Sequence, residues 1–320
     1  MKKIKSAPSV LILCTGLLFI FLVLSGCQKE LSSLYSDTRP NTSLEEFFEK
    51  TTSSSMQSFT LNTNAGGTIR GEKGTDFTFK KLSFIDPDGS LIRGTVKLNV
   101  LEILTPADII LNNAATMSNG LPLESGGAFY IDATYNNQKA RLAPGTFVKI
   151  DILNTSASSP GMQVFSGYRQ DTTGSVNWIV NNSPGNMVVP DSARGNRNPL
   201  DTINVLFSDS LNWINCDKFL NEPKIACSFP FENNPDKDST AIFVQFTGRN
   251  SVMRIYEDAN TGFGSPSLVA GPATVVGICI KDQKLYSSVI NVSLQSRQSF
   301  TLKFSADTQE QLKDKLKLLK

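Results

Sequence analysis

The sequence contains no histidine among its 320 residues. Ser-His-Asp and Cys-His hydrolases need an imidazole to carry the proton, and catalytic zinc is usually held by histidine. The motifs Ser-x-x-Lys, Gly-x-x-x-x-Gly-Lys and Gly-x-Gly-x-x-Gly are also missing, which removes common routes to an activated serine and to a bound nucleotide. We therefore expect a protein that is not an enzyme and that holds no metal and no cofactor.

An excess of positive charge is missing as well. The chain has 31 Lys and Arg against 29 Asp and Glu. Residues 1–26 hold three lysines and no acid, so the remainder has 28 basic and 29 acidic side chains and a net charge near −1. Because nucleic-acid binding depends on a basic surface, we expect no nucleic-acid partner.

The N-terminus has the pattern of a secretory signal. Lys2, Lys3 and Lys5 precede an apolar run over 10–24, which is shorter than the roughly 20 residues of a membrane-spanning helix. The residues Leu24-Ser25-Gly26-Cys27 that follow resemble the bacterial lipobox. The resemblance implies cleavage before Cys27 and attachment of acyl chains such as palmitate to that residue, which would anchor the protein in a lipid bilayer.

The residue after the cysteine bears on the membrane. Gln28 stands where inner-membrane retention in well-studied bacteria is associated with Asp. We therefore expect a lipid-anchored protein of the outer membrane. Whether its body faces the periplasm or the cell surface stays open, because Lys29-Glu30 only partly resembles a surface-export signal.

The body of the chain has the composition of an all-β protein. Thr, Val, Ile and Phe are frequent, and turn residues recur at short intervals. Alternating apolar and polar residues predict half-buried strands over 95–100, 129–135 and 148–152. Asp307-Thr308-Gln309-Glu310 predicts the cap of a C-terminal helix whose leucines dock on the body.

Composition also predicts the domain organisation, because nearly 300 residues suggest two domains. We expect two Ig-like β-sandwich domains after the signal peptide and a flexible tether. Within the tether, Ser43-Leu44-Glu45-Glu46 is typical of a capping box that opens a short helix. The predicted boundaries are 1–26 for the signal peptide, 27–58 for Cys27 and the tether, 59–180 for the first sandwich, 181–199 for a linker, 200–306 for the second sandwich and 307–320 for the helix.

Several segments of the predicted first domain resemble a known sandwich. Gly66-Gly67-Thr68-Ile69, the strand at 94–100, 123–129 and Pro144-Gly145 occur in the order seen in a β-sandwich domain of exported Bacteroidota proteins. That domain is similar to the sandwich of ankyrins and netrin receptors. Trp213 to Phe219 resembles a recurring segment of uncharacterised Bacteroidota lipoproteins, and we interpret it as a packed corner rather than a polar pocket. These resemblances imply a scaffolding or binding role.

Two kinds of candidate site remain in the exported part. Cys216 and Cys227 are candidates for a disulfide, whereas Cys279 in an apolar strand is expected to be a buried thiol. Repeated Asp-Ser and Asp-Thr motifs resemble the O-glycan acceptor of exported Bacteroidota proteins. The acceptor hydroxyls would belong to Thr172, Ser192, Thr202, Ser210 and Ser239.

We therefore expect a membrane-anchored lipoprotein of the cell envelope with a non-enzymatic binding or structural role. Its partner would be a glycan, a peptide or an envelope protein. Two alternatives stay open. A carbohydrate-active hydrolase needs only two carboxylates about 5–9.5 Å apart. An adhesion or assembly subunit would show exposed strand edges or an apolar patch.

Overall fold

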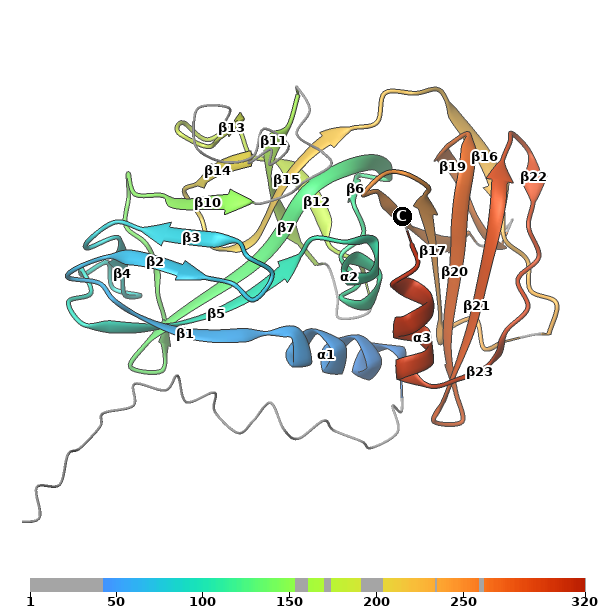
Figure 1. The fold of residues 1–320 in the computed structure, drawn as a ribbon, viewed down its shortest axis with the longest axis horizontal. Helices are drawn as coiled ribbons and strands as arrows, with labels where there is room; N and C mark the ends of the chain where they lie inside the picture. Colours follow the sequence, from blue (N-terminus) through green and yellow to red (C-terminus); the bar gives the residue numbers. More distant parts are fainter. Residues whose placement is uncertain are drawn as a thin grey trace, which may run out of the picture. The chain divides into compact units, whose positions relative to one another are not determined.

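The structure is a computed structural model that describes residues 43–152, 161–169, 174–190, 204–233, 235–258 and 262–319. Strands make up 54% and helices 11% of the residues that the structure describes, which confirms the predicted mostly β class (Figure 1). The described residues belong to one compact unit. None of the described helices is long and apolar enough to cross a membrane.

The first sheet is antiparallel and is built around the long strand β7. Alternation between buried and exposed residues in β5 confirms the pattern that predicted it. The strand order is β1 (Gln57–Asn62), β5 (Thr95–Ile103), β7 (Leu121–Tyr135), β15 (Asn212–Phe219), β11 (Gln163–Tyr168) and β12 (Asn177–Val180), with β6 (Met117–Ser118) and β8 (Gln138–Lys139) also paired to β7.

The second sheet shares a hydrophobic core with one face of the first. Phe77 and Ile150 from this sheet lie in the same buried cluster as Leu98 and Ile131 from the first. The strand order is β13 (Met187–Pro190), β14 (Asn204–Ser208), β10 (Val148–Ile152), β3 (Asp76–Phe79) and β2 (Gly67–Arg70), and a separate small pair joins β4 (Phe84–Ile85) to β9 (Arg141–Leu142).

Strands β14 and β15 join the part of the chain that follows the predicted linker to the sheets of the predicted first domain. Both follow the predicted linker 181–199 in sequence, but β14 pairs with β10 and β15 pairs with β7 and β11. Residues 204–219 therefore complete the sheets formed by residues before the linker. The predicted tether is also folded where the structure describes it, because residues 43–58 form helix α1 (Leu44–Ser55) and the start of β1.

The third sheet curls around its own core. Cys227 of β16 and Leu294 of β21 lie near opposite ends of the strand order yet belong to one buried cluster. Such sharing requires the curled, half-barrel form. The strand order is β22 (Gln298–Ser299), β16 (Lys224–Ser228), β19 (Gly262–Val269), β18 (Val252–Asp258), β17 (Thr240–Phe246), β20 (Gly271–Lys281), β21 (Lys284–Leu294) and β23 (Ser305–Asp307), antiparallel except between β22 and β16.

Helices fill the space between the first and third sheets (Figure 1). Helix α1 is capped by Ser43, whose side chain accepts a hydrogen bond from the Glu46 backbone, as the sequence predicts. Its Phe48 meets Phe243 of β17 with ring centroids 6.2 Å apart. Helix α2 (Pro106–Leu111) and helix α3 (Gln309–Leu316) join the same cluster. The leucine face of α3 is therefore docked, as predicted.

The turn between β17 and β18 fastens the third sheet to the first. Asn250 Nδ2 donates to the carbonyls of Leu104 and Ser125 over 3.1 and 3.0 Å. The Ser125 N–H donates to the Asn250 carbonyl over 2.8 Å, and the Thr116 N–H donates to the Val252 carbonyl over the same distance. These bonds satisfy buried backbone groups of the first sheet and of the β17–β18 turn, so the first and third sheets are held in a fixed position relative to each other.

Candidate functional site

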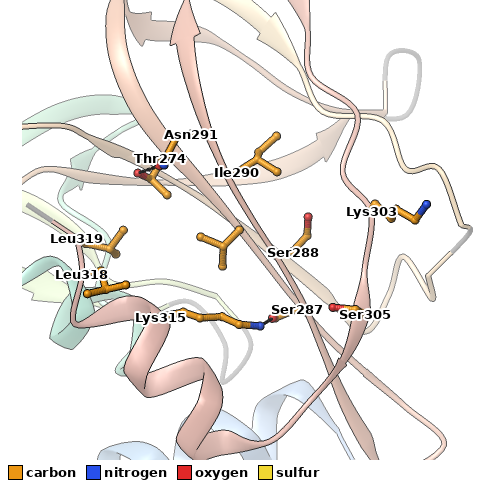
Figure 2. Close-up of a pocket in the computed structure, with 11 residues that line it drawn as sticks. Thr274, Ser287, Ser288, Ile290, Asn291, Lys303, Ser305, Lys315, Leu318 and Leu319 are labelled. Carbon is orange, nitrogen blue, oxygen red and sulfur yellow. Dashed lines mark hydrogen bonds between the residues drawn. The ribbon is translucent and has the colours of Figure 1, made fainter.

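A groove lies along strand β21, between the C-terminal end of helix α3 and the segment 303–305 (Figure 2). It encloses about 450 Å³. The lining combines hydroxyl, amide, aliphatic and ammonium groups and contains no carboxylate, so it suits binding through hydrogen bonds and positive charge. The lining residues are Thr274, Ser287, Ser288, Val289, Ile290, Asn291, Lys303, Ser305, Lys315, Leu318 and Leu319.

The backbone edge of β21 is open along this groove. Strand β21 pairs with β20 along its whole length but with β23 only at Leu285, Tyr286 and Ser287. In the described part of the chain, no segment is hydrogen bonded to the outer edge of 288–294. This edge carries no charged residue and no proline, which are the usual means of blocking strand addition.

Ser287 and Lys315 point toward each other in the groove (Figure 2), and both contact the carboxylate of Asp307. Lys315 Nζ lies 2.6 Å from Asp307 Oδ2 and 3.1 Å from Ser287 Oγ, and the Ser287 hydroxyl donates to the same carboxylate. A Ser-Lys hydrolase needs an unpaired amine as the base, whereas this amine is held in an ion pair. Ser287 is also only 1% exposed. The contact therefore fastens helix α3 to β21 and β23.

The second lysine of the groove is held loosely. Lys303 Nζ lies 3.2 Å from Glu232 Oε1, and the two side chains are 70% and 56% exposed. Exposed ion pairs of this kind contribute little, about 0–1 kcal/mol. Lys303 can therefore exchange Glu232 for an acidic group of a ligand at small cost.

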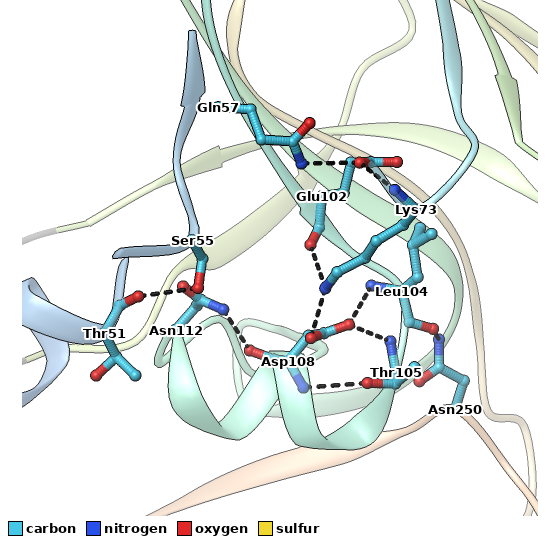
Figure 3. A network of polar contacts seen from close by, with 10 residues as sticks. All are labelled: Thr51, Ser55, Gln57, Lys73, Glu102, Leu104, Thr105, Asp108, Asn112 and Asn250. Carbon is cyan, nitrogen blue, oxygen red and sulfur yellow. Dashed lines mark hydrogen bonds and ion pairs between the residues drawn. The ribbon is translucent and has the colours of Figure 1, made fainter. Parts of the chain in front are cut away.

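Away from the groove, a polar network joins α1, β1, β5 and α2 around the carboxylate of Glu102 (Figure 3). Glu102 is 1% exposed and accepts hydrogen bonds from Gln57 Nε2, from the Lys73 N–H and from the Thr75 N–H. Lys73 Nζ in turn lies 2.6 Å from Asp108. Every partner is part of the protein, so we interpret this network as structural.

The segment 213–219 is the central strand β15 rather than a corner. Trp213 packs against Trp178 and Tyr130 with ring centroids 6.0 and 5.0 Å apart. Asn215 and Asp217 are fully buried and hydrogen bonded to each other. Burial raises the pKa of Asp217 well above its ordinary value. The segment is thus packed, as expected, but with a buried polar pair inside it.

The cysteines do not form the predicted bridge. Cys216, Cys227 and Cys279 are free and buried. Cys216 lies in the core between the first two sheets, whereas Cys227 lies inside the curl of the third sheet. The predicted Cys216–Cys227 disulfide is therefore absent from the structure, because the two thiols belong to different cores. Cys279 is a buried thiol in β20, as expected.

Most of the other predicted site residues lie outside the described residues. This holds for the lipidation site Cys27 and for the candidate acceptors Thr172, Ser192 and Thr202. Ser210 lies between β14 and β15, and Ser239 lies immediately before β17; both are half-buried. Their glycosylation stays a prediction. Within the described ranges, no group of three or more His, Cys, Asp or Glu side chains is placed to hold a metal ion.

Comparison with known proteins adds no assignment: no protein-family model matches the chain, and no curated protein matches it. The groove, the open edge of β21 and the charges beside it are the features that bear on function.

Proposed function

We propose that this chain is a cell-envelope lipoprotein that captures an extended segment of a partner polypeptide by adding it as a strand to the open edge of β21. The observation that carries the proposal is the uncharged, unpaired edge of 288–294 inside a groove. Main-chain hydrogen bonds would supply affinity, and the side chains of the groove would supply selectivity.

The chemistry of the groove specifies the partner further. Lys303 can exchange its exposed partner Glu232, whereas Lys315 is held by the buried side chain of Asp307. An acidic side chain of the captured segment is therefore favoured next to Lys303. Leu318 is 76% exposed and offers an apolar contact at the end of helix α3. The preferred occupant is therefore an extended segment that combines acidic and apolar residues.

The membrane anchor is part of the same proposal. A lipidated Cys27 would hold the binding body at the outer membrane, with the bilayer as its first partner. Metabolic labelling with a palmitate analogue tests this, because Cys27→Ser should abolish the label and leave the unprocessed leader in place. A labelled, processed C27S product would contradict it.

We further propose that the first two sheets form an Ig-like β-sandwich related to the Bacteroidota domain that the sequence resembles. The shared core of residues from both sheets supports this. The third sheet, a single curled sheet with its own core, would take the place of the predicted second domain. A solved structure of any exported Bacteroidota protein with this resemblance would test the relationship by superposition.

Two proline variants test strand addition. Successive residues of a strand direct their N–H groups to opposite neighbours, so of Val289→Pro and Ile290→Pro one removes a bond to β20 and the other removes an N–H on the open edge. Thermal unfolding identifies the variant that keeps the wild-type stability. That variant should lose binding to an array of synthetic peptides with alternating acidic and apolar residues.

Three results would decide against the proposal. The stable proline variant could bind the peptides as tightly as the wild-type chain does. The wild-type chain could bind glycans on an array but no peptides, which would favour the alternative of a carbohydrate-active protein. It could also dimerise through β21, with dimerisation abolished by the same proline, which would favour an assembly subunit.

A further inference from the structure

Two arginines converge on one tyrosine where the first and third sheets meet. Arg254 of β18 stacks on Phe243 and on Tyr256, with its guanidinium carbon 4.9 and 5.8 Å from the ring centroids. Arg169, directly after β11, stacks on Trp213 at 5.0 Å. Arg169 is linked to Tyr256 through Ser175: the Ser175 N–H donates to the Tyr256 hydroxyl, and the Ser175 hydroxyl and Arg169 Nη2 both donate to the Asn113 carbonyl. We call Arg169, Arg254 and Tyr256 the arginine–tyrosine cluster.

The positive charge of this cluster has no acidic partner among the described residues. Neither Arg169 nor Arg254 forms an ion pair with an acidic residue of that part of the chain. Arg254 is 6% exposed, and its Nε and Nη1 atoms are buried without a hydrogen-bond partner. The Nε of Arg169 is also buried without a partner, although its Nη2 donates to the carbonyls of Asn112 and Asn113.

A buried charge without an ion-pair partner is costly, since the guanidinium of Arg254 loses its hydration and gains only its contacts with the rings of Phe243 and Tyr256 in exchange. Burial lowers the pKa of Arg254 only to about 10, so this side chain stays charged at neutral pH. Arginine is also the residue best suited to grip an oxyanion, because its N–H groups form a planar fork. The cluster thus has the donors and the charge of an anion site, but none of the described residues supplies the anion.

The cluster is reachable from solvent. Tyr256 is 49% exposed, and Arg169 is half-buried. The Tyr256 hydroxyl accepts a hydrogen bond from the Ser175 N–H over 3.3 Å, which leaves the phenolic proton free to donate. The rings of Trp213 and Phe243 each stack on one of the two guanidinium groups.

We propose that the arginine–tyrosine cluster is a binding site for a doubly charged tetrahedral oxyanion, a phosphate or sulfate group, held between Arg169 and Arg254 with a hydrogen bond from Tyr256. Two guanidinium charges match two negative charges, which favours these groups over a single carboxylate. The site lies on β11 and β18, whereas the groove lies on β21, so this inference is independent of the proposed strand addition.

The test uses the full chain in non-ionic detergent, with thermal unfolding and calorimetry in sodium phosphate, sodium sulfate, sodium acetate or sodium chloride at equal ionic strength. Phosphate and sulfate should raise the unfolding temperature above that in chloride, and acetate should raise it less. Vesicles of phosphatidylcholine with and without phosphatidate show whether the phosphate group is accepted from a lipid as well as from solution.

Three variants locate the effect. Arg254→Met keeps the apolar stem and removes the charge, and it should weaken phosphate binding about ten- to hundredfold. Without the anion it should unfold at the wild-type temperature or above, since an uncompensated charge is gone. Arg169→Gln should weaken binding by a similar factor. Arg93→Gln, which removes an exposed arginine, should leave binding unchanged.

The proposal is overturned if phosphate and sulfate stabilise the chain no more than chloride does. It is also overturned if R254M and R169Q both bind phosphate as the wild-type chain does. A lowered unfolding temperature of R254M without any anion, together with unchanged binding by R169Q, would show that Arg254 is a structural cation and would likewise overturn it.

Discussion

Replacing Gly71 by alanine should destabilise the protein only while Glu102 is present. A Cβ atom at residue 71 would lie 2.3 Å from Glu102 Oε2 and 2.4 Å from its Cδ. Gly71 does not have a positive φ, so the backbone accepts alanine and the cost arises from the collision alone. The buried carboxylate cannot move aside freely, because Gln57, Lys73 and Thr75 donate hydrogen bonds to it.

The magnitude follows from these contacts. Overpacking a buried site costs about 1–3 kcal/mol, and a hydrogen bond to a charged group contributes about 1.5–3 kcal/mol. G71A should therefore lower the free energy of unfolding by about 3 kcal/mol. In a Glu102→Ala background the colliding atoms are gone, so the same change should cost within about 0.5 kcal/mol of zero. The coupling energy of the double-mutant cycle should be about 2–3 kcal/mol.

Urea unfolding followed by the fluorescence of Trp178 and Trp213 measures the cycle. Gly89→Ala is the matched control. A Cβ at residue 89 would meet nothing within 4 Å. Because Gly89 has a φ of +93°, the loss of stability in G89A comes from backbone strain alone. G89A should therefore lose the same stability with and without Glu102. Additive effects of G71A and E102A would refute the argument that the glycine exists to admit the carboxylate.

Three further predictions concern buried groups. Burial in the folded state raises the pKa of Asp217. The contribution of Asp217 to stability is therefore complete below its pKa in the unfolded chain and is lost as pH rises through its pKa in the folded chain. Urea midpoints at pH 5 and pH 8 should differ less in Asp217→Asn than in the wild-type chain. Trp178→Phe loses the 2.9 Å bond from Nε1 to the Ala115 carbonyl and should cost about 2 kcal/mol, measured by urea unfolding. Burial raises the pKa of Cys216, so a thiol reagent should label it only after unfolding, as mass spectrometry would show.

Local patterns predicted the parts of the fold that local chemistry decides. The alternation at 95–100 and 129–135 identified β5 and β7, and Asn136-Asn137 ends β7 because both residues adopt a positive φ. Helix α2 could have been found in the same way. Thr105 caps it, Pro106 is its first residue, and Asp108 completes the capping box.

What the sequence could not show depends on contacts between distant residues. The sequence of Trp213 to Phe219 suggests a packed corner, because a strand buried on both faces, as β15 is between β7 and β11, shows no alternation of apolar and polar residues. The groove needs the curl of the third sheet and the docking of α3 at once. Arg169 and Arg254 are 85 positions apart, and nothing near either one signals the other.

The docking of the two sheets and the proposed oxyanion site are thermodynamically linked. Arg169 directly follows a strand of the first sheet, and Arg254 belongs to the third sheet. The two arginines therefore come together only while the β17–β18 turn is bound to the first sheet. That turn is held by Asn250, which bonds to Leu104 and Ser125. An anion that binds both arginines must therefore stabilise the docked arrangement by the same free energy that docking contributes to binding. The unpaired charge of Arg254 would weaken docking when the anion is absent and strengthen it when the anion is bound, which makes the interface between the sheets sensitive to the ligand.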